Sequence, residues 1–248
     1  MEDNPSEAIL ANVIGTRNVA DLSHTYGTKR FVFISTDKAV NPTSVMGASK
    51  RLAEMYVQSI NAHSSCTYVI TRFGNVLGSN GSVIPLFKRQ IETGGPITVT
   101  HPEMTRFFMT IPEAVQLVIE ASVMSSGGEI FLFDMGKSVK IYDLATNMIK
   151  LYGLELGKDI EIKITGLRPG EKLYEELFFD SESSIPTHHP KILIAKVTPP
   201  DFGLIAAEIN NLSELFKEQD NMKLVAKIKE LITNYKSNNS AFEVLDRS

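Results

Sequence analysis

The chain has 248 residues, 43% of them hydrophobic and 22% charged, which is ordinary for a globular protein with one main core. Its formal net charge of -4 gives no electrostatic reason to expect nucleic acid or an anionic membrane surface as a partner. The single cysteine, Cys66, excludes an internal disulfide and a cysteine-based zinc site, and the five histidines form no metal-ligand pattern, so no metal is predicted.

The first part of the chain alternates predicted helices with buried strands. A helix capped by Ser6 is expected to run to about residue 26. Residues 30–35 form an apolar run without alternation, which is typical of a strand covered on both faces of a parallel sheet. A helix over about 45–63 and a second buried strand over 67–73 follow. This order indicates parallel crossovers.

The same alternation continues to residue 136. A helix is predicted over 82–93, a short strand over 97–100 and a further helix from residue 112 to the glycines at 127–128. Residues 130–133 form a third apolar strand. The pattern therefore predicts an α/β fold, namely the C-terminal portion of a doubly wound, Rossmann-type parallel sheet.

Beyond residue 136 the pattern changes to that of a smaller α+β region. A helix is expected over 143–153, and residues 160–164 and 192–197 alternate like its strands. Residues 202–235 look helical, with a break near Asp220. The predicted organisation is a partial Rossmann-type domain over 1–136, a smaller substrate-binding region over 137–200 that also draws on about 76–110, and a C-terminal helical extension over 201–248.

Several features that a complete dinucleotide-binding protein would carry are absent from the sequence. No two of the sixteen glycines are separated by one residue, so there is no Gly-x-Gly-x-x-Gly fingerprint. Three sheet strands can be counted where a doubly wound sheet has about six. The first half of the fold is therefore expected to be missing, leaving an apolar strand edge exposed and the chain prone to aggregate. No apolar stretch of bilayer length and no signal region are present, so we expect a cytoplasmic protein without a membrane span.

The densest polar cluster follows the first strand. Ser35, Thr36, Asp37 and Lys38 come at its end, and Lys50 stands twelve residues further on. Ligands of open α/β sheets bind at the carboxyl ends of strands, and a hydroxyl, a carboxylate and an amine there can transfer protons on a bound alcohol. The alternative is a capped loop in which Asp37 pairs with Lys38 in solvent, and these residues alone leave both open.

Four blocks of sequence resemble one family. They are the stretch from Ser35 through Met46-Gly-Ala-Ser-Lys50, Thr71-Arg-Phe-Gly-Asn-Val-Leu-Gly-Ser79, Met104-Thr-Arg-Phe-Phe-Met109 and Gly166-Leu-Arg-Pro-Gly-Glu-Lys-Leu-Tyr-Glu-Glu176. Together they resemble extended short-chain dehydrogenases, and more narrowly the UDP-N-acetylglucosamine 4,6-dehydratases of the CapD-like polysaccharide-biosynthesis group. The resemblance runs from residue 1 to about residue 195.

The resemblance implies a reaction and a cofactor. Such enzymes oxidise the C4 hydroxyl of a UDP-sugar by hydride transfer to NAD or NADP, eliminate water across C5 and C6, and return the hydride to C6. The product is a 4-keto-6-deoxy sugar. It implies that Lys50 hydrogen-bonds the nicotinamide ribose, and that Ser35 and Phe73 also lie on the cofactor side.

The resemblance also assigns roles in the elimination. Thr36 matches the hydroxyl that contacts the C4 oxygen, Asp37 the acid that protonates the departing C6 hydroxyl, and Lys38 the base that takes the C5 proton. A base must be a neutral amine, and burial beside Lys50 would favour that form. Met46 occupies the place where the general pattern has Tyr; a thioether cannot shuttle a proton, so Asp37 or a water bound to Thr36 is the candidate to deprotonate the C4 hydroxyl. Core packing is the alternative interpretation of Met46.

A third group of residues resembles the ligands of the nucleotide. Arginine suits diphosphate because its fork binds phosphate oxygens bidentately, and a helix start offers free N–H groups. Without the family context Arg106 and Arg168 would be interpreted as surface charges. One departure is Asn80, where many relatives carry Arg. The predicted substrate ligands are Asn75, Ser82, Val83, Arg106 and Arg168.

Three functions remain open from the sequence. The first is an active dehydratase that is completed by a separate N-terminal NAD-binding half. In that case the chain is the product of a truncated reading frame, a split subunit or an expressed fragment. The second is a non-catalytic remnant that binds a nucleotide sugar or a partner. The third is a nucleotide-sugar 4-epimerase, against which Asp37 and Lys38 argue, because epimerisation needs no acid and base at C5 and C6. Members of the family commonly associate with each other through helices, so the resemblance predicts a homo-oligomer.

Overall fold

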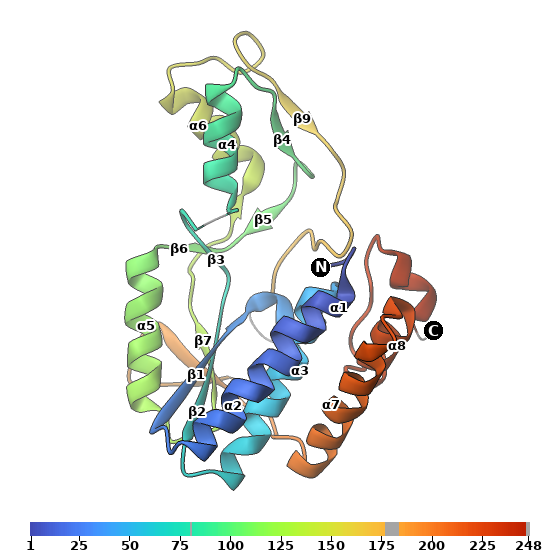
Figure 1. The fold of residues 1–248 in the computed structure, drawn as a ribbon. Coiled ribbons are helices and arrows are strands. Elements are labelled where there is room, and N and C mark those ends of the chain that lie inside the picture. Colours follow the sequence, from blue (N-terminus) through green and yellow to red (C-terminus); the bar gives the residue numbers. More distant parts are fainter. Residues whose placement is uncertain (80, 177–183, 247–248) are drawn as a thin grey trace.

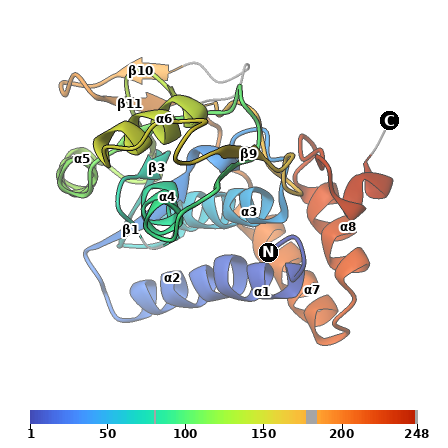
Figure 2. The ribbon, with the colours of Figure 1, turned by 90° about the horizontal axis from the view of Figure 1, so that it is seen from above.

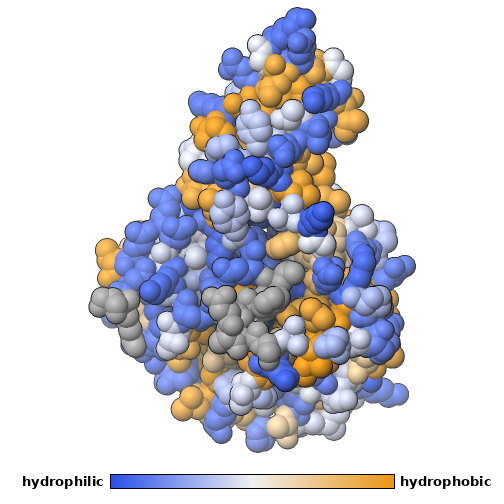
Figure 3. All heavy atoms as spheres, turned by 180° about the vertical axis from the view of Figure 1, so that it is seen from behind, coloured by the Kyte–Doolittle hydropathy of each residue, from blue (hydrophilic) through white to orange (hydrophobic). Residues whose placement is uncertain are grey.

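The chain folds into a broad lower lobe built on a sheet and a smaller upper lobe (Figure 1). The computed structural model describes residues 1–79, 81–176 and 184–246. Seen from behind as spheres, the narrower upper lobe stands on the lower one with a constriction between them (Figure 3). In the described residues, no helix is both long and apolar enough to span a bilayer.

The main sheet contains all three predicted buried strands. Its order is β1-β2-β7-β11-β10, and β1 (Arg30–Thr36), β2 (Thr67–Phe73) and β7 (Ile130–Phe133) run parallel. β11 (Ile192–Ala195) and β10 (Ser184–Pro186) extend the sheet antiparallel. The predicted α/β class with a parallel sheet is therefore confirmed.

The placement of residues 192–197 in the smaller region was wrong. β11 pairs with β7 in the main sheet, where Ile192 lies opposite Phe133 and both are fully buried. Alternation of apolar and polar residues indicates a strand but does not specify its partner, because pairing depends on where the chain returns from the upper lobe.

Helices cover the two faces of the sheet unequally. α3 (Val45–Ile60) lies on one face, and α7 (Phe202–Lys217) and α8 (Asn221–Leu231) pack outside it. The N-terminal helix also packs outside α3; it comprises α1 (Pro5–Ala8), a π-helical stretch (Ile9–Ile14) and α2 (Gly15–Thr25) (Figure 2). On the other face, α5 (Ile111–Met124) packs on β1 and β2.

Two predicted helix signals can be compared with the structure. Ser6 is not the cap of the first helix, because Pro5 is already helical and its fixed φ and missing N–H suit the first position. The break near Asp220 is confirmed, since its carboxylate accepts hydrogen bonds from the Met222 and Lys223 N–H groups and starts α8.

The upper lobe has a core of its own. α4 (Val83–Glu92) and α6 (Ile141–Leu151) pack with β4 (Ile97–Val99) and β9 (Ile162–Ile164), a parallel pair. Buried members of this core include Phe87, Ile97, Met104 and Ile149. Two short strand pairs lie at the junction of the lobes: β3 (Asn75–Val76) with β6 (Phe108–Met109), and β5 (Thr105–Arg106) with β8 (Val139–Lys140). Short 3-10 turns occupy Asp37–Ala39, Asn61–His63 and Ala241–Leu245.

A buried charge network ties β1, β2 and α3 together. The Glu54 carboxylate of α3 is fully buried and accepts hydrogen bonds from Arg72 Nε at 2.8 Å and from Arg72 Nη2 at 2.6 Å. Ser35 donates to the same carboxylate at 2.6 Å, and Arg51 lies 3.1 Å from it. Burial by itself would raise the pKa of Glu54, but these partners, led by Arg72, hold it below the ordinary value. The network fixes the end of β1 against the helix that carries Met46 and Lys50.

One side of the lower lobe presents apolar groups to solvent. β1 is an edge strand, and Ile34 near its carboxyl end is 43% exposed. The expectation that residues 30–35 form a strand covered on both faces was therefore wrong. On the adjoining α5, four residues spaced four apart form an exposed apolar stripe: Ile111, Val115, Ile119 and Val123. A helix that is apolar outward as well as inward is usually covered by something else.

We therefore expect the purified chain to self-associate through this stripe. Placing a charge in the stripe with Ile119→Glu should shift the chain toward the monomer, because a buried glutamate would lose its hydration. Light scattering across a concentration series measures this. Leu151→Glu, at an 83% exposed apolar residue of the upper lobe, is the matched control and should leave association unchanged. Equal association of both variants and the wild type would contradict the expectation.

Candidate functional site

The polar cluster that follows β1 is held in a tight turn. Thr36 Oγ1 donates to the Asp37 carboxylate at 2.9 Å and accepts from the Lys38 N–H at 3.3 Å. Asp37 is fully buried and pairs with Lys38 Nζ at 2.9 Å. The ion pair of the capped-loop interpretation therefore exists, but it does not lie in solvent. A buried carboxylate at the carboxyl end of a strand is a candidate for proton transfer.

A second buried carboxylate, Glu175, joins this pair and was missed from the sequence. Lys38 Nζ lies 3.3 Å from Glu175 Oε1 and donates to Asn75 Oδ1 at 3.3 Å. Burial raises the pKa of Glu175, and Asp37 adds to this effect, while nearby cations oppose it. Sequence offered one signal, the position of Glu175 inside the block 166–176, but nothing separated it from its exposed neighbour Glu176.

Both carboxylates keep one oxygen without a hydrogen-bond partner among the described residues. These atoms, Asp37 Oδ2 and Glu175 Oε2, are buried. A Cβ atom added to Gly74 would come within 2.7 Å of Asp37 Oδ2, so a glycine is needed for this close approach. Buried oxygens without partners are costly in a structural role and are common at sites that move protons.

The start of α3 brings Met46 and Lys50 to the same end of the sheet. Ser44 caps this helix by accepting from the Gly47 N–H, and a Cβ atom on Gly47 would lie 2.2 Å from the Lys38 carbonyl oxygen. Met46 is half-buried and lines a cavity, which differs from the core-packing alternative. The glycine thus lets the helix approach the loop that carries the predicted base.

Lys50 is held against the end of β1. Its Nζ donates to the Ile34 carbonyl at 2.9 Å and sits 4.3 Å from the centre of the Phe33 ring. Burial lowers the pKa of Lys50, and Glu54 opposes this. In the described part of the chain, Lys38 pairs with Asp37 and Glu175 and donates to Asn75, so the expected pairing of Lys38 with Lys50 is not among its contacts.

The residues present fit a nicotinamide cofactor only in part. Lys50 fits, because its ammonium has three donors and lies half-buried at the carboxyl end of the edge strand. Ser35 is 4% exposed and its hydroxyl is used by Glu54, and Phe73 is 9% exposed and stacks on Phe133 at 5.5 Å. The cofactor roles of Ser35 and Phe73 stay predictions.

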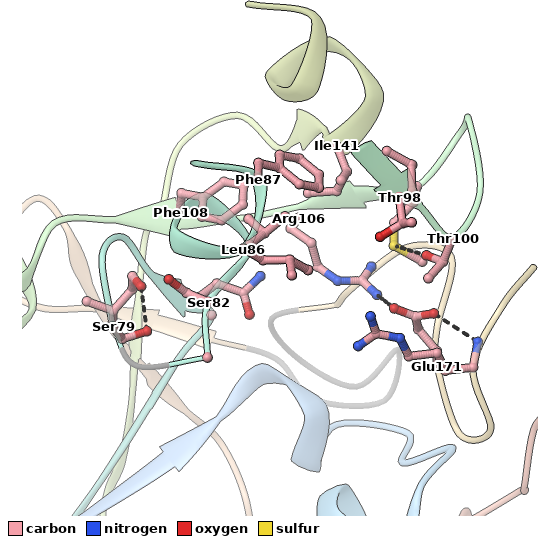
Figure 4. A pocket seen from close by; sticks show the side chains of 18 residues that line it. Ser79, Ser82, Leu86, Phe87, Thr98, Thr100, Arg106, Phe108, Ile141 and Glu171 are labelled. Carbon is pink, nitrogen blue, oxygen red and sulfur yellow. Dashed lines mark hydrogen bonds and ion pairs between the residues drawn. The ribbon is translucent and has the colours of Figure 1, made fainter. Parts of the chain in front are cut away.

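A cavity of about 520 Å³ opens between the lobes, with the α4 start, β4 and the β5–β6 segment around it. Figure 4 shows the aromatic rings of Phe87 and Phe108 on one side and the Arg106 guanidinium directed at Glu171 on the other. All five predicted substrate ligands line this cavity: Asn75, Ser82, Val83, Arg106 and Arg168. Asn80, which stands where many relatives carry Arg, lies outside the described residues.

A second cavity, of about 380 Å³, reaches the polar cluster. Its lining includes Lys38, Met46 and Glu175. Arg106 and Arg168 line both cavities, so they form a shared wall between the aromatic pocket and the proton-transfer cluster. A ligand whose charged group lies at these arginines would reach into both spaces.

Arg106 is a buried cation with several partners. Its guanidinium donates to the backbone carbonyls of Thr105 and Lys172, both at 2.8 Å. It also lies 3.6 Å from Glu171 Oε1 and 3.5 Å from Glu175 Oε1. The alternative that it is a surface charge is wrong for Arg106, whose side chain is 9% exposed. Arg168 is exposed.

The loop that carries Arg168 is braced by the C-terminal extension. The Gly170 N–H donates to the Asn238 carbonyl at 2.6 Å, and the Asn238 side chain donates to the Glu171 carbonyl at 2.9 Å. Asn239 donates to the Leu167 carbonyl at 2.6 Å. The tail therefore fixes the wall of the cavities, a role that no sequence signal indicated.

Comparisons with known proteins agree with this architecture. The capsular polysaccharide biosynthesis protein CapD of Staphylococcus aureus is 56% identical over 219 residues, which are 86% of this chain and 36% of that protein. The crystal structure of Pen from Bacillus thuringiensis superposes with a TM-score of 0.74 at 39% identity, covering 81% of this chain and 62% of that one. The chain thus spans little more than a third of the length of this curated relative.

Relatives of two activities are also found. A UDP-N-acetylglucosamine 4,6-dehydratase (inverting) of Campylobacter jejuni is 36% identical over 74% of this chain and 54% of its own length. A UDP-glucose 4-epimerase of Rickettsia rickettsii is 40% identical over 72% of this chain and 52% of its own length. The family of polysaccharide biosynthesis proteins matches residues 1–197. With its Rossmann-like fold and the site at the carboxyl ends of its strands, the chain belongs to this polysaccharide biosynthesis protein family, the CapD-like group of the extended short-chain dehydrogenases.

Proposed function

We propose that this chain provides the substrate site and the elimination residues of a UDP-N-acetylglucosamine 4,6-dehydratase of surface polysaccharide or glycan biosynthesis. One observation carries the proposal: the cavity lined by all five predicted nucleotide ligands shares the wall of Arg106 and Arg168 with the cavity of Lys38, Met46 and Glu175. A nucleotide sugar has the matching order, with a base and ribose, a diphosphate and a sugar in sequence.

The two cavities suit the two ends of such a substrate. The larger one offers the ring of Phe108 for the nucleoside, and its volume is in the range of ordinary small-molecule sites. The diphosphate would lie at Arg106 and Arg168, whose guanidinium groups can pair with its oxygens. The sugar would then extend toward Asp37 and Lys38.

The residues of the cluster can carry out the elimination. When bound, a nicotinamide cofactor supplies the hydride acceptor that turns the C4 hydroxyl into a ketone. The ketone acidifies the C5 proton, which the Lys38 amine takes, and Asp37 gives a proton to the departing C6 hydroxyl. Thr36 would hydrogen-bond the C4 oxygen, and Lys50 would hold the cofactor ribose.

We also propose that the unit holding NAD or NADP lies outside these 248 residues. The chain has no glycine fingerprint for a dinucleotide, and β1 leaves the edge of the parallel sheet open beside the apolar stripe of α5. A further parallel strand with its helices would cover both. We accordingly expect no NAD-dependent 4-keto sugar formation by the chain alone.

A 4-epimerase is the second candidate, supported by the relative of that name at 40% identity. Epimerisation inverts C4 and leaves the C5 proton in place. A non-catalytic remnant would bind the nucleotide and do neither. Chemistry at C5 therefore separates the dehydratase from the other two functions.

Exchange of the C5 proton tests the proposal without any cofactor. A UDP-linked 4-keto-6-deoxy sugar already carries the activating ketone, so the chain in D₂O should replace its C5 proton by deuterium well above the background rate, as read by proton NMR. Lys38→Met should reduce exchange by at least about a hundredfold, which is the low end of what a general base contributes. Lys163→Met, at an exposed lysine of β9, should exchange like the wild type. Binding of UDP without C5 exchange would leave an epimerase or a remnant.

A further inference from the structure

Glu175 connects the predicted base to the predicted phosphate ligand. Its Oε1 atom lies 3.3 Å from Lys38 Nζ and 3.5 Å from Arg106 Nε. The side chain is 2% exposed, and the other oxygen has no partner among residues 1–79, 81–176 and 184–246. Glu175 therefore contacts both the predicted base Lys38 and the predicted phosphate ligand Arg106.

We propose that Glu175 takes up the proton that Lys38 must lose to act as a base, and that a diphosphate bound at Arg106 promotes this transfer. The inference rests on the proposed function, because it assigns the proton donor to the base of the same elimination.

The charges around Glu175 explain why binding would matter. Asp37, Lys38, Arg106 and Lys172 act on it, and burial is the largest effect, which raises its pKa. Arg106 opposes that rise. A diphosphate at Arg106 brings negative charge close to Glu175 and offsets the guanidinium, so the neutral form of the carboxyl gains further.

The proton would move directly from Lys38 Nζ to a Glu175 oxygen, and Oε1 lies 3.3 Å away. An Nζ–H bond of the Lys38 ammonium breaks and an Oε–H bond of Glu175 forms, which leaves a neutral amine and a neutral acid. No other reactant is needed. The Glu175 side chain is 2% exposed, and burial raises its pKa, which favours the protonated form that this transfer produces. Glu175 contacts both Lys38 and Arg106, so it is the carboxylate through which a phosphate at Arg106 would act on the predicted base.

The first test follows the charge of Glu175 directly. The chain is labelled with carbon-13 at the glutamate side-chain carboxyl, and the Glu175 signal is identified by its loss in Glu175→Gln. UDP should move the titration midpoint of this signal up by about one pH unit or more, which is the effect expected of an added neighbouring charge. Uridine, which has no phosphate, should leave it in place. A midpoint unchanged by saturating UDP would overturn the inference.

The second test uses the pH dependence of C5 exchange. If Glu175 takes the proton, the reactive pair has the same total number of protons as the resting pair, so the wild-type rate should be flat near neutral pH. In Glu175→Gln the amine must lose its proton to solvent, and the rate should rise about tenfold per pH unit. Glu176→Gln, at the exposed neighbouring glutamate, should keep the flat profile.

The outcomes separate the inference from the proposed function. A merely structural counter-ion would give a tenfold slope in the wild type as well, with the Glu175→Gln profile displaced to lower pH, and this would overturn the inference while the dehydratase site stands. Absence of both UDP binding and C5 exchange in the wild type would remove the proposed function, and the inference with it.

Discussion

Glu54→Gln is expected to lower the free energy of unfolding by about 3–5 kcal/mol, the usual cost of removing one partner from a buried ion pair. Glu54 is fully buried, and Glu54→Gln removes the carboxylate charge that pairs with the Arg72 guanidinium, itself 1% exposed in the sheet. Small domains are stable by only about 5–15 kcal/mol, so this one change would remove a large part of the total.

Urea unfolding followed by far-ultraviolet circular dichroism measures this loss, which suits a chain without tryptophan. The control is Glu92→Gln, which removes the exposed pair with Lys88 at 3.8 Å and should cost less than about 0.5 kcal/mol. A loss of similar size in both variants would mean that the buried network does not stabilise the sheet as described.

The same network gives the sign of a pH effect. The pKa of Glu54 is held below its ordinary value of 4.5, so its charged form is favoured in the folded chain. This contribution is fully present above about pH 4.5 and is lost as the pH falls through the lower folded pKa. The wild type should therefore lose its advantage over Glu54→Gln on acidification below pH 4.5, as seen in urea midpoints measured from pH 7 downward.

Removing the cations of the shared wall is expected to weaken UDP binding strongly. A hydrogen bond to a charged group contributes about 1.5–3 kcal/mol, so Arg168→Met should raise the Kd for UDP by roughly 10- to 150-fold. Arg168 is exposed, so its loss should not cost stability. Arg106→Met should lose at least as much affinity and also destabilise the chain, because buried Glu175 would lose a cation.

Calorimetric titration with UDP and with uridine separates the phosphate effect from damage to the pocket. Arg168→Met should affect UDP and leave uridine unchanged. Arg89→Met, at an exposed arginine of α4 outside the cavity lining, is the matched control. Equal losses for UDP and uridine would show that Arg168 shapes the pocket and does not bind phosphate.

The parts of the fold that sequence predicted are those that local chemistry determines. β1, β2 and β7 are apolar runs without alternation, and each was found as a parallel strand of the main sheet. β2 and β7 are buried, as such runs predict, whereas β1 is an edge strand whose Ile34 is exposed. The partner of β11 was not predictable, because its alternation fits any half-covered sheet. The start of the first helix differed because a proline at the first position replaced the expected serine cap.

The site was predictable to the extent that family blocks mark residues. Those blocks gave Arg106 and Arg168, which line the same cavity although they lie far apart in sequence. They did not give Glu175, because burial distinguishes it from Glu176 and burial arises only when the loop folds over Lys38. They also could not show that Arg106 binds backbone carbonyls as well as carboxylates.

The bracing of the Arg168 loop by Asn238 and Asn239 has a consequence for divergence within the family. The family match ends at residue 197, whereas these two asparagines stand some forty residues later. Substitutions in that tail can shift the Arg168 loop while every residue of the cavity stays the same, and if Arg168 binds the diphosphate as proposed, such shifts would change the affinity for it. Relatives with identical cavity linings would then differ in ligand affinity because of a segment that a comparison of those linings would never inspect.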